Sequence, residues 1–334
     1  MGQMERIGVM TSGGDAPGMN AAVRSITRRG LDAGLEILGI KRGYAGLLNE
    51  EITPLSDSDV SGKVNRGGTF LLTARSEKFR SEEGQQKALD ILHKNQIDGL
   101  IVIGGDGSMR GAKKLEEKGF PTAFLPGTID NDIPCTDYSI GFDTAINTVT
   151  NIVDKIRDTA TSHERVFIIE TMGRHNGILT LEAGLAAGAE AILIPEIEFD
   201  IEEVCRVVAK GYDRGKLHNL ILVAEGVDYT HGESYADRKN RVVFEIGKKI
   251  ESRTGHEVRE IVLGHVQRGG APSAKDRILA SKMGARVLEG IMEGKSGRMI
   301  AKEGNLFSMI SYEKVLNNEV SIDKSLYELA HIIG

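Results

Sequence analysis

The chain alternates short apolar runs with longer stretches in which apolar residues recur at helical spacing. The short runs are nearly continuous, which is typical of parallel strands buried on both faces. They predict strands at residues 7–10, 37–40, 100–103, 123–125, 166–170, 191–194, 220–224 and 261–264. The longer stretches predict helices at residues 20–30, 82–95, 108–118, 144–159 and 274–293. This alternation indicates a doubly wound α/β protein with mostly parallel sheets.

The organisation of the chain predicts two domains, for which its 334 residues provide enough length. We expect a division near Gly141, where a long helix begins, and a second series of strands and helices that extends to about His265. Residues 267–270 then precede another long helix. Residues 228–241 are polar and charged, so we expect them to form an exposed excursion from the second series.

Composition and charge narrow the class of protein. Charged residues make up 27% of the chain and the formal net charge is −6, which argues against broad binding of nucleic acid. The two cysteines, Cys135 and Cys205, have no CxxC spacing, which favours a reducing compartment over a disulfide framework or a zinc site. No apolar run approaches the length of a membrane span, and the first residues lack the apolar region of a secretory signal. We therefore expect a cytoplasmic protein that binds neither nucleic acid nor a membrane.

Three predicted strands end in glycine-rich turns that carry an aspartate. Asp15, Asp106 and Asp130 follow the first, third and fourth predicted strands, and Asp132 lies close behind Asp130. In an open α/β sheet, ligands bind beyond the carboxyl ends of the strands. Glycines let the backbone approach phosphates, aspartates can hold Mg²⁺, and one aspartate could take a proton from a hydroxyl. The set suits transfer of a phosphoryl group to an alcohol.

Alternative roles for the glycine turns fit the sequence less well. Any one such turn is as readily a structural corner between a strand and a helix, but three turns that each carry an aspartate make this a poor account of the set. The dinucleotide fingerprint GxGxxG is absent from the first turn, and the phosphate-loop motif GxxxxGK[ST] is absent from the chain. The sequence therefore disfavours a simple NAD enzyme and a P-loop enzyme.

Basic residues beside glycines or at strand ends are candidates for binding anions, because an arginine fork can hold phosphate oxygens in bidentate fashion. They are Arg75, Arg165, Arg174, Arg259 and Arg268. The alternative for any single arginine is a solvated surface charge. His265, at a strand end, suits a phosphate contact or an ordinary capping role, and Glu225 suits either sugar hydroxyls or the cap of the next helix.

Seven longer motifs together resemble the ATP-dependent 6-phosphofructokinases of the bacterial type, nearly from end to end. They are TSGGDAPGMNAA (11–22), NRGGT (65–69), IGGDGS (103–108), PGTIDND (126–132), IRDTATSHER (156–165), ETMGRHNG (170–177) and VLGHVQRGG (262–270). The resemblance implies two Rossmann-like doubly wound α/β/α domains with mostly parallel sheets. Residues 1–141 plus 267–317 would form the larger, ATP-binding domain. Residues 142–266 plus 318–334 would form the smaller domain, which binds fructose 6-phosphate.

The resemblance also implies a function and a mechanism. The enzyme would transfer the γ-phosphate of ATP to the 1-hydroxyl of fructose 6-phosphate, giving fructose 1,6-bisphosphate and ADP in glycolysis. Asp130 would accept the hydroxyl proton, while Thr128 and the Gly14 amide would stabilise the transferring phosphoryl group. Arg75 and Arg174 would bridge charge between the substrates.

Further residues are implied for each ligand. The ATP site would comprise Gly14, Tyr44, Arg75, Ser76, Gly105, Asp106, Gly107, Ser108 and Gly111, with Asp106 holding Mg²⁺ and Asp132 beside it. The sugar phosphate would contact Thr128, Asp130, Asp132, Arg165, Met172, Gly173, Arg174, Glu225, Arg259, His265 and Arg268. In this family Arg165 and Arg259 reach into a neighbouring subunit's site, which implies a homotetramer.

The family also binds ADP and phosphoenolpyruvate as effectors. The matching residues here are Arg24, Arg28, Arg157, Gly188, Glu190, Arg214 and Lys216. Two positions depart from the pattern, since Asp57 and Gly62 stand where some relatives carry arginine and aspartate. We expect an altered charge at the rim of the effector pocket and therefore retuned regulation.

Two alternative functions can be weighed within the sequence. Pyrophosphate-dependent relatives tend to carry aspartate at the position of Gly107 and lysine at that of Gly127, and both positions are glycine here. A regulatory subunit that only binds nucleotides would be expected to lose Asp130 or Asp106, and both are present. The sequence therefore favours a catalyst that uses ATP.

Overall fold

The computed structural model describes residues 4–228 and 242–334. The chain forms two compact units, of which the first comprises Met1–Thr144 and Arg268–Val320 and the second comprises Ala145–Gln267 and Ser321–Gly334. Residues 229–241, which make up nearly all of the expected polar excursion, lie outside the described residues.

The first unit contains a seven-stranded sheet with the strand order β11-β10-β5-β4-β1-β2-β3. Its strands are β1 (Arg6–Ser12), β2 (Glu36–Ile40), β3 (Ile52–Pro54), β4 (Gly99–Gly104), β5 (Thr122–Pro126), β10 (Arg298–Glu303) and β11 (Leu306–Ser311). The inner pairs are parallel, whereas β2–β3 and β10–β11 at the two edges are antiparallel. Every residue of β4 is buried, as expected for a central strand covered on both faces.

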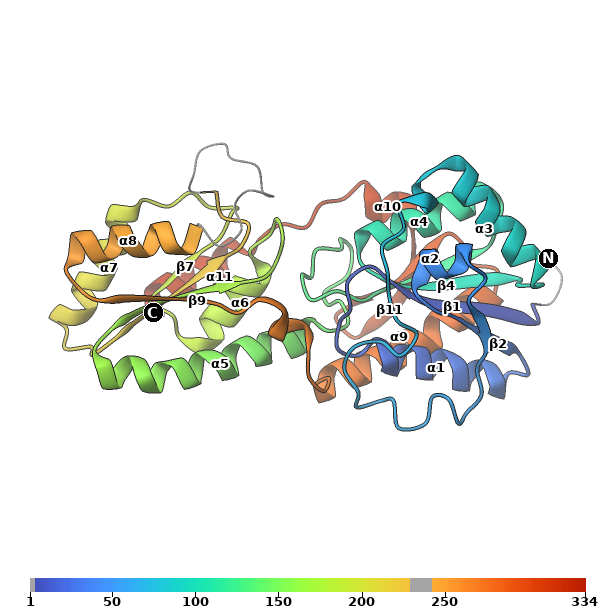
Figure 1. Cartoon of the computed structure of the whole chain (residues 1–334), viewed down its shortest axis with the longest axis horizontal. Coiled ribbons are helices and arrows are strands. Elements are labelled where there is room, and N and C mark those ends of the chain that lie inside the picture. The colour runs from blue at the N-terminus through green and yellow to red at the C-terminus, as the bar shows by residue number, and fades with distance from the viewer. Residues whose placement is uncertain (1–3, 229–241) are drawn as a thin grey trace. The chain divides into compact units, whose positions relative to one another are not determined.

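Helices cover both faces of this sheet. They are α1 (Met19–Asp32), α2 (Gly43–Leu48), α3 (Glu82–Lys94), α4 (Asp106–Glu117), α9 (Ala274–Met292) and α10 (Tyr312–Leu316), and a short 3₁₀ turn, η1 (Lys78–Arg80), precedes α3. Figure 1 shows α1 and α9 on one side of the sheet and α3 and α4 on the other. Local chemistry sets where α3 begins, because the Ser81 hydroxyl accepts a hydrogen bond from Gly84 N and two glutamates occupy the first turn.

The second unit contains a four-stranded, wholly parallel sheet with the order β7-β8-β6-β9. Its strands are β6 (Val166–Thr171), β7 (Ala191–Leu193), β8 (Asn219–Ala224) and β9 (Val258–Val262). Its helical elements are α5 (Phe142–His163), α6 (Ile178–Ala187), α7 (Ile201–Asp213), α8 (Val242–Thr254), η2 (Gly264–Arg268) and α11 (Lys324–Ile333), of which α5 begins and η2 ends in the first unit. Figure 1 shows α5 on one side of the sheet and α7 and α8 on the other.

The start of α5 is fixed by a buried carboxylate from α9. Asp276 is fully buried, and its oxygens accept hydrogen bonds from Gly141 N at 2.9 Å, Thr144 N at 2.8 Å and Thr144 Oγ1 at 2.5 Å. These donors lie at or just before the first turn of the helix, so Asp276 caps α5 from another element. Burial raises the pKa of the Asp276 carboxyl above its ordinary value, although the hydrogen bonds from Thr144 and Gly141 act in the opposite direction.

The connections in the first unit mark where a ligand would bind. Helix α1 leads from β1 outward to β2, whereas α4 leads from β4 in the opposite direction to β5. The winding therefore reverses between the neighbouring strands β1 and β4. In doubly wound sheets this reversal opens a ligand-binding crevice at the carboxyl ends of the strands. Two of the glycine turns identified in the sequence, after β1 and after β4, lie at this point.

The expected fold class is confirmed, since mostly parallel sheets carry helices on both sides. One strand differs from its expected position at residues 261–264, because β9 runs over Val258–Val262 and pairs Val166 with Val258. The first residues of β9 alternate in character, and the apolar run includes Val262, which is 38% exposed. The apolar run therefore marks only the second half of the strand and the turn after it.

The hairpin of β10 and β11 has no counterpart among the predicted strands. The edge strand β11 buries only Ile310 and leaves Leu306 75% exposed, so it lacks a continuous apolar run. Gly304 has a φ of +57° in the two-residue turn between the strands, and Gly304–Asn305 is a hairpin signal that could have located the pair.

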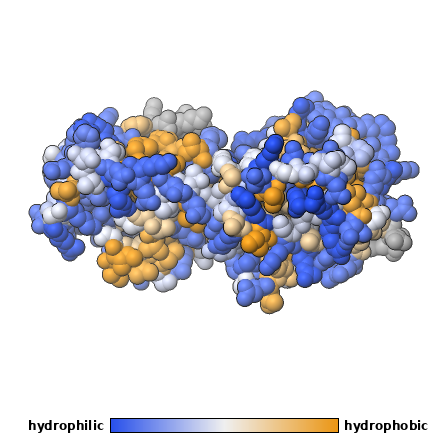
Figure 2. Space-filling model, turned by 90° about the horizontal axis from the view of Figure 1, so that it is seen from below, coloured by the Kyte–Doolittle hydropathy of each residue, from blue (hydrophilic) through white to orange (hydrophobic). Residues whose placement is uncertain are grey.

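Figure 2 shows hydrophilic side chains over most of the face in view, with apolar patches between them. Among the helices of residues 4–228 and 242–334, none is both long enough and apolar enough to cross a membrane.

Candidate active site

The turns after β1, β4 and β5 meet backbone to backbone in the first unit. A Cβ atom at Gly104, the last residue of β4, would lie 2.3 Å from the Ser12 carbonyl oxygen. Gly127 N donates to the Gly104 carbonyl at 2.8 Å, which joins the turn after β5 to the other two. A side chain at Gly104 would force the backbone apart, so this glycine allows the three strand ends to converge. Bare backbone at such an edge can approach a phosphate closely.

Asp130 and Thr128 lie in the turn after β5. Asp130 is 2% exposed and Thr128 is 6% exposed. Asp130 N donates to Thr128 Oγ1 at 3.2 Å, which ties the two residues into one local arrangement. A buried carboxylate beyond the carboxyl end of a parallel strand is suited to accept a proton from a bound hydroxyl.

Arg268 extends toward the same turns. Its Nη2 lies 3.9 Å from Asp130 Oδ1, and its Nη1 donates to the Asp15 carbonyl at 3.2 Å. A Cβ atom at Gly14 would lie 2.9 Å from Arg268 Nη1, so the guanidinium lies directly over that glycine. The Arg268 side chain is only 13% exposed. The structure thus brings together Gly14, Asp130 and Arg268, three of the residues expected at the site.

Tyr44, which is expected in the ATP site, packs against α4. Its ring stacks on Phe79 with centroids 3.9 Å apart, and a Cβ atom at Gly111 would lie 2.6 Å from it. The Tyr44 hydroxyl donates to the Ser108 carbonyl at 2.8 Å. Burial raises the pKa of this hydroxyl well above its ordinary value, so it stays protonated and holds the first turn of α4 in place.

The segment that carries Arg75 and Ser76 is attached to the turn after β1. Thr73 Oγ1 donates to the Gly13 carbonyl at 2.7 Å, and Thr11 Oγ1 donates to the Leu72 carbonyl at 2.9 Å. Arg75 itself is exposed. These hydrogen bonds place the Arg75 backbone beside the glycine turn and leave its guanidinium in solvent. Local sequence does not reveal the anchoring threonines, because their partners lie far away in the chain.

Asp106 is the residue that could hold a divalent cation. It is the first residue of α4, follows Gly105, and pairs with Arg110 through an Nε–Oδ2 distance of 3.0 Å. Within the described residues, no group of three or more His, Cys, Asp or Glu side chains could hold a metal alone. Mg²⁺ in nucleotide sites is usually bound by one or two carboxylates together with phosphates, so Asp106 with a nucleotide fits this ion. Gly107, next to it, is exposed with open space around the position of a Cβ atom.

In the second unit, the turn after β6 is held by a glutamate and a glutamine. Glu225 Oε1 accepts hydrogen bonds from Gly173 N at 3.2 Å and Arg174 N at 2.8 Å. Gln267, which is fully buried, accepts from Met172 N at 3.2 Å. The structure therefore brings Met172, Gly173, Arg174 and Glu225 together. Sequence analysis did not single out Gln267, although it lies inside the VLGHVQRGG motif.

A second glutamate, Glu170, lies two residues before this turn in β6. Burial, and then the negative charge of Glu225, raise the pKa of the Glu170 carboxyl to about 7. Two glutamates whose charges repel each other therefore adjoin the turn that presents Arg174, and one of them is partly protonated near neutral pH.

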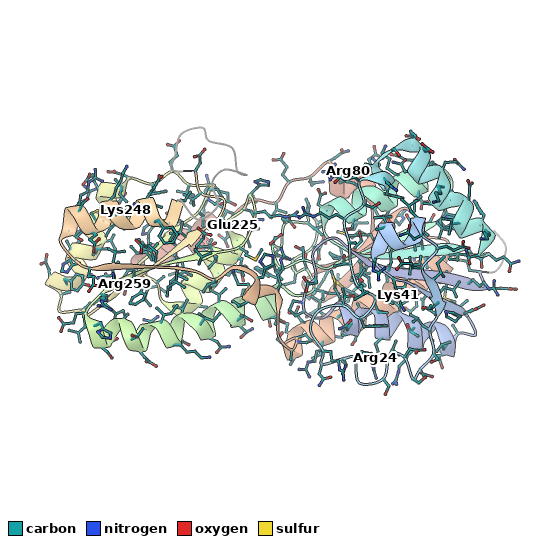
Figure 3. All side chains as sticks on the ribbon, in the orientation of Figure 1. Arg24, Lys41, Arg80, Glu225, Lys248 and Arg259 are labelled. Carbon is teal, nitrogen blue, oxygen red and sulfur yellow. The ribbon has the colours of Figure 1, made fainter. Side chains whose placement is uncertain are left out.

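Arg165 and Arg259, both expected to bind the sugar phosphate, share one carboxylate. Glu257 Oε2 accepts from Arg165 Nε at 2.6 Å, and Glu257 Oε1 pairs with Arg259 Nη2. The hydrogen bond from Arg165 is the main cause that lowers the pKa of Glu257. Figure 3 labels Arg259 on β9 and Glu225 in the same unit. His265 is exposed in η2.

The residues assigned to an effector fall into two groups, one in each unit. In the first unit, Arg24 and Arg28 lie on α1, where Figure 3 labels Arg24. Arg28 Nε lies 3.2 Å from Asp57 Oδ1, so the unusual aspartate pairs with a residue of the expected effector set. Gly62 has a φ of +64°, a backbone conformation that glycine adopts readily.

The second group surrounds Glu190, which is 6% exposed. Glu190 accepts from Lys216 Nζ at 3.1 Å and from Leu220 N at 2.6 Å. Arg157 donates to the Ala187 carbonyl, and Gly188 ends α6 in the left-handed conformation. Arg214 is exposed at the end of α7.

His218 was not singled out from the sequence but belongs to this group. Its Nδ1 lies 3.0 Å from Thr161 Oγ1. Burial is the main cause that lowers the pKa of His218. The charge of Glu190 acts in the opposite direction, and the smaller effects of Arg157 and Lys216 lower the pKa further.

A family model and curated proteins similar in sequence agree on what this chain resembles. The model of a family described as "Phosphofructokinase" matches residues 6–291. The ATP-dependent 6-phosphofructokinase of Halothermothrix orenii is 52% identical over 335 residues, covering 99% of this chain and 100% of that protein. The enzyme of the same name from Alkaliphilus metalliredigens is 52% identical over 331 residues, with the same two coverages.

Solved structures resemble this chain over nearly its whole length. The T-state phosphofructokinase of Pichia pastoris has a TM-score of 0.87 at 34% identity, covering 95% of this chain and 36% of that one. A pyrophosphate-dependent phosphofructokinase from Marinobacter aquaeolei has a TM-score of 0.82 at 22% identity, covering 96% of this chain and 86% of that one. At that identity the second likeness concerns the fold alone.

Proposed function

The chain belongs to the phosphofructokinase family, and from that membership we propose that it is an ATP-dependent 6-phosphofructokinase. It would transfer the γ-phosphate of ATP to the 1-hydroxyl of fructose 6-phosphate, giving fructose 1,6-bisphosphate and ADP, as a step of glycolysis. The observation that carries this proposal is the buried Asp130 at the meeting point of three glycine turns. A proton acceptor and a bare phosphate-binding backbone are thereby combined at the edge where a doubly wound sheet binds ligands.

Each residue has a stated part in the proposed mechanism. Asp130 takes the proton of the sugar 1-hydroxyl as that oxygen attacks the γ-phosphorus. Thr128 and the Gly14 amide donate to the transferring phosphoryl group, and Arg75 and Arg174 neutralise its negative charge. Because phosphoryl transfer requires mainly positioning and charge neutralisation, no covalent intermediate with the protein is needed. Mg²⁺, held by Asp106 with Asp132 beside it, would supply further positive charge on the nucleotide phosphates.

The sugar phosphate would be held mainly by the second unit. Arg165, Arg259 and His265, together with Arg268, would bind its 6-phosphate, while Met172 and Glu225 would contact the sugar. Glu225 already accepts two backbone hydrogen bonds through Oε1, so a sugar hydroxyl would use its other oxygen. The ATP residues Tyr44, Ser76, Gly105, Ser108 and Gly111 belong to the first unit, of which Tyr44 and Gly111 pack against each other.

ATP rather than pyrophosphate is the proposed donor. Open space surrounds Gly107, where pyrophosphate-dependent relatives tend to carry aspartate, and this space is available for nucleotide phosphates. A Cβ atom at Gly127 would lie 3.2 Å from Met19 Cε and 3.3 Å from Ile103 Cγ2, so a lysine would crowd its neighbours there.

The donor is tested by measuring kcat/KM for ATP and for pyrophosphate, with Mg²⁺ and saturating fructose 6-phosphate, in a coupled assay. We expect the wild type to have a higher kcat/KM for ATP than for pyrophosphate, and we expect the ratio of the two values to be smaller in Gly107→Asp. A wild type that prefers pyrophosphate would contradict the proposal.

The proposal extends to the oligomeric state of the enzyme, its cellular location and its regulation. We propose a cytoplasmic homotetramer in which Arg165 and Arg259 act on a neighbour's substrate, and sedimentation analysis that finds only monomers would contradict it.

ADP and phosphoenolpyruvate would bind the effector residues and shift the sugar-phosphate saturation curve by favouring different quaternary states. If neither ADP nor phosphoenolpyruvate changes the fructose 6-phosphate saturation curve, this regulation is excluded.

A further inference from the structure

Arg268 contacts the groups that would perform the chemistry. Its guanidinium lies over Gly14, donates to the Asp15 carbonyl and faces the Asp130 carboxylate at 3.9 Å. Both charged side chains of the pair are shielded from water, with Arg268 13% exposed and Asp130 3% exposed. A shielded pair of opposite charges is screened little by salt, so it attracts more strongly than a surface pair.

This inference rests on the proposed function, which gives the Arg268 guanidinium a different partner from Asp130. There Arg268 binds the 6-phosphate of the sugar, and Asp130 must receive the proton of the sugar hydroxyl. A guanidinium has donors but no acceptor, and a phosphate dianion is a strong bidentate partner for it. An acceptor phosphate can therefore compete with Asp130 for Arg268, and the sugar hydroxyl can then reach the carboxylate oxygen.

We propose that Arg268 is a positioning residue that alternates between Asp130 and the acceptor phosphate, and that it thereby prevents ATP from being hydrolysed before the sugar is bound. While Arg268 faces Asp130, it keeps water from using that carboxylate as a base. While it covers Gly14, it also occupies the place of the transferring phosphoryl group. When the sugar phosphate draws it away, both become available together. This coupling belongs to the class in which binding of the correct substrate completes the catalytic site.

The reaction that this contact suppresses is fully defined. A water oxygen forms a bond to the γ-phosphorus, and the bond from that phosphorus to the β,γ-bridging oxygen breaks. ADP leaves with the electron pair of the broken bond, and the water proton passes to Asp130. Water is smaller than a sugar and could enter any site that admits a hydroxyl, so excluding it requires a group that occupies the site.

The test compares phosphate release from Mg-ATP in the absence of sugar with phosphoryl transfer at saturating fructose 6-phosphate. Arg268→Ala should raise hydrolysis without sugar by at least about tenfold, which is a small part of the ~10²–10⁴ that a positioned base supplies. Its transfer rate at saturating sugar should not rise, because in the wild type the bound sugar phosphate has already drawn Arg268 away from Asp130. Arg268→Lys, which keeps the charge, should give a smaller increase.

Two further variants separate this effect from general damage. Adding Asp130→Asn to Arg268→Ala should remove the extra hydrolysis, because the released base is its cause. Arg277, a partly buried arginine of α9 that donates to the Pro272 carbonyl, is the matched control, and Arg277→Ala should keep the wild-type ratio of hydrolysis to transfer. Should Arg268→Ala fail to fold, Arg268→Ser, which also removes the guanidinium from Gly14 and Asp130, replaces it.

The proposal is overturned if a folded, uncharged Arg268 variant hydrolyses ATP no faster than the wild type, or if its extra hydrolysis survives loss of Asp130. Failure of the proposed function gives a different result, namely a wild type that does not phosphorylate fructose 6-phosphate with ATP. The two failures are therefore distinguished by the wild-type transfer assay alone.

Discussion

The residues proposed to bind phosphate are held in different ways in the two units. In the first unit, the binding edge is made of backbone: glycine turns pack against one another, and a buried aspartate lies among them. In the second unit, the residues proposed to bind phosphate are mainly arginines: Glu257 pairs with the guanidinium groups of Arg165 and Arg259, whereas Glu225 accepts a hydrogen bond from the backbone N of Arg174. Backbone geometry leaves few alternatives, whereas paired side chains can exchange partners at little cost. Substitutions in the first unit should therefore affect the chemical step and stability, and those in the second unit, apart from Arg174, should mainly affect affinity.

The largest effect is expected at Asp130. Asp130→Ser removes the proposed base, so kcat should fall by at least about 10²–10⁴ while the KM for fructose 6-phosphate changes little. Steady-state kinetics with both substrates varied measures the two quantities separately. Near wild-type turnover in the Asp130→Ser variant would show that the buried carboxylate is not the base.

The next effect concerns stability rather than rate. Asp276→Ala leaves Gly141 N and both donors of Thr144 without their buried acceptor, which should cost about 2–4 kcal/mol of unfolding free energy. Chemical denaturation followed by circular dichroism gives this difference. Asp32→Ala, which removes an exposed partner of Arg29, is the control and should change stability by less than about 1 kcal/mol. Equal effects of the two substitutions would mean that the cap on α5 contributes nothing.

The fold was largely predictable, because its inner strands have a clear sequence signal. Strands β1, β4 and β5 contain continuous apolar runs buried on both faces, and their glycine turns follow directly in the sequence. Edge strands such as β11 bury few residues and carry no such signal. The start of β9 lacks it for a similar reason, since exposed and buried residues are mixed there.

The site was predictable as a set of motifs but not as a set of contacts. The position of Arg268 over Gly14, and the sharing of Glu257 by two arginines, depend on residues that lie far apart in the chain and meet only after folding. Gln267 and Asp276 are buried polar residues, and nothing in their local sequence distinguishes a hydrogen-bond acceptor from a surface side chain.

A smaller effect is expected where side chains hold the binding groups. Glu257→Gln removes the charge that holds Arg165 and Arg259, so both arginines should be more available to a sugar phosphate. We expect the KM for fructose 6-phosphate to fall by a few-fold and kcat to stay nearly constant. A rise in KM would show instead that Glu257 aligns the two arginines for binding.

The smallest effect is a pH dependence. With its pKa raised to about 7, Glu170 keeps its proton in the folded protein at pH values where the unfolded chain, with the ordinary value of 4.5, has lost it. Its contribution to stability is therefore present below about pH 4.5 and is lost as the pH rises through about 7. Relative to Glu170→Gln, the wild-type melting temperature should fall between about pH 5 and pH 8. A difference that is constant over this range would mean that Glu170 titrates normally.

The central claim is that the first unit presents a phosphoryl group and a base to a sugar hydroxyl. Phosphorus NMR of the wild type with equimolar Mg-ATP and fructose 6-phosphate tests this most directly. The account predicts that the γ-phosphate signal disappears while a new 1-phosphate ester of the sugar and ADP appear in equal amounts. Release of inorganic phosphate with the fructose 6-phosphate signal unchanged, or no loss of ATP, would contradict it.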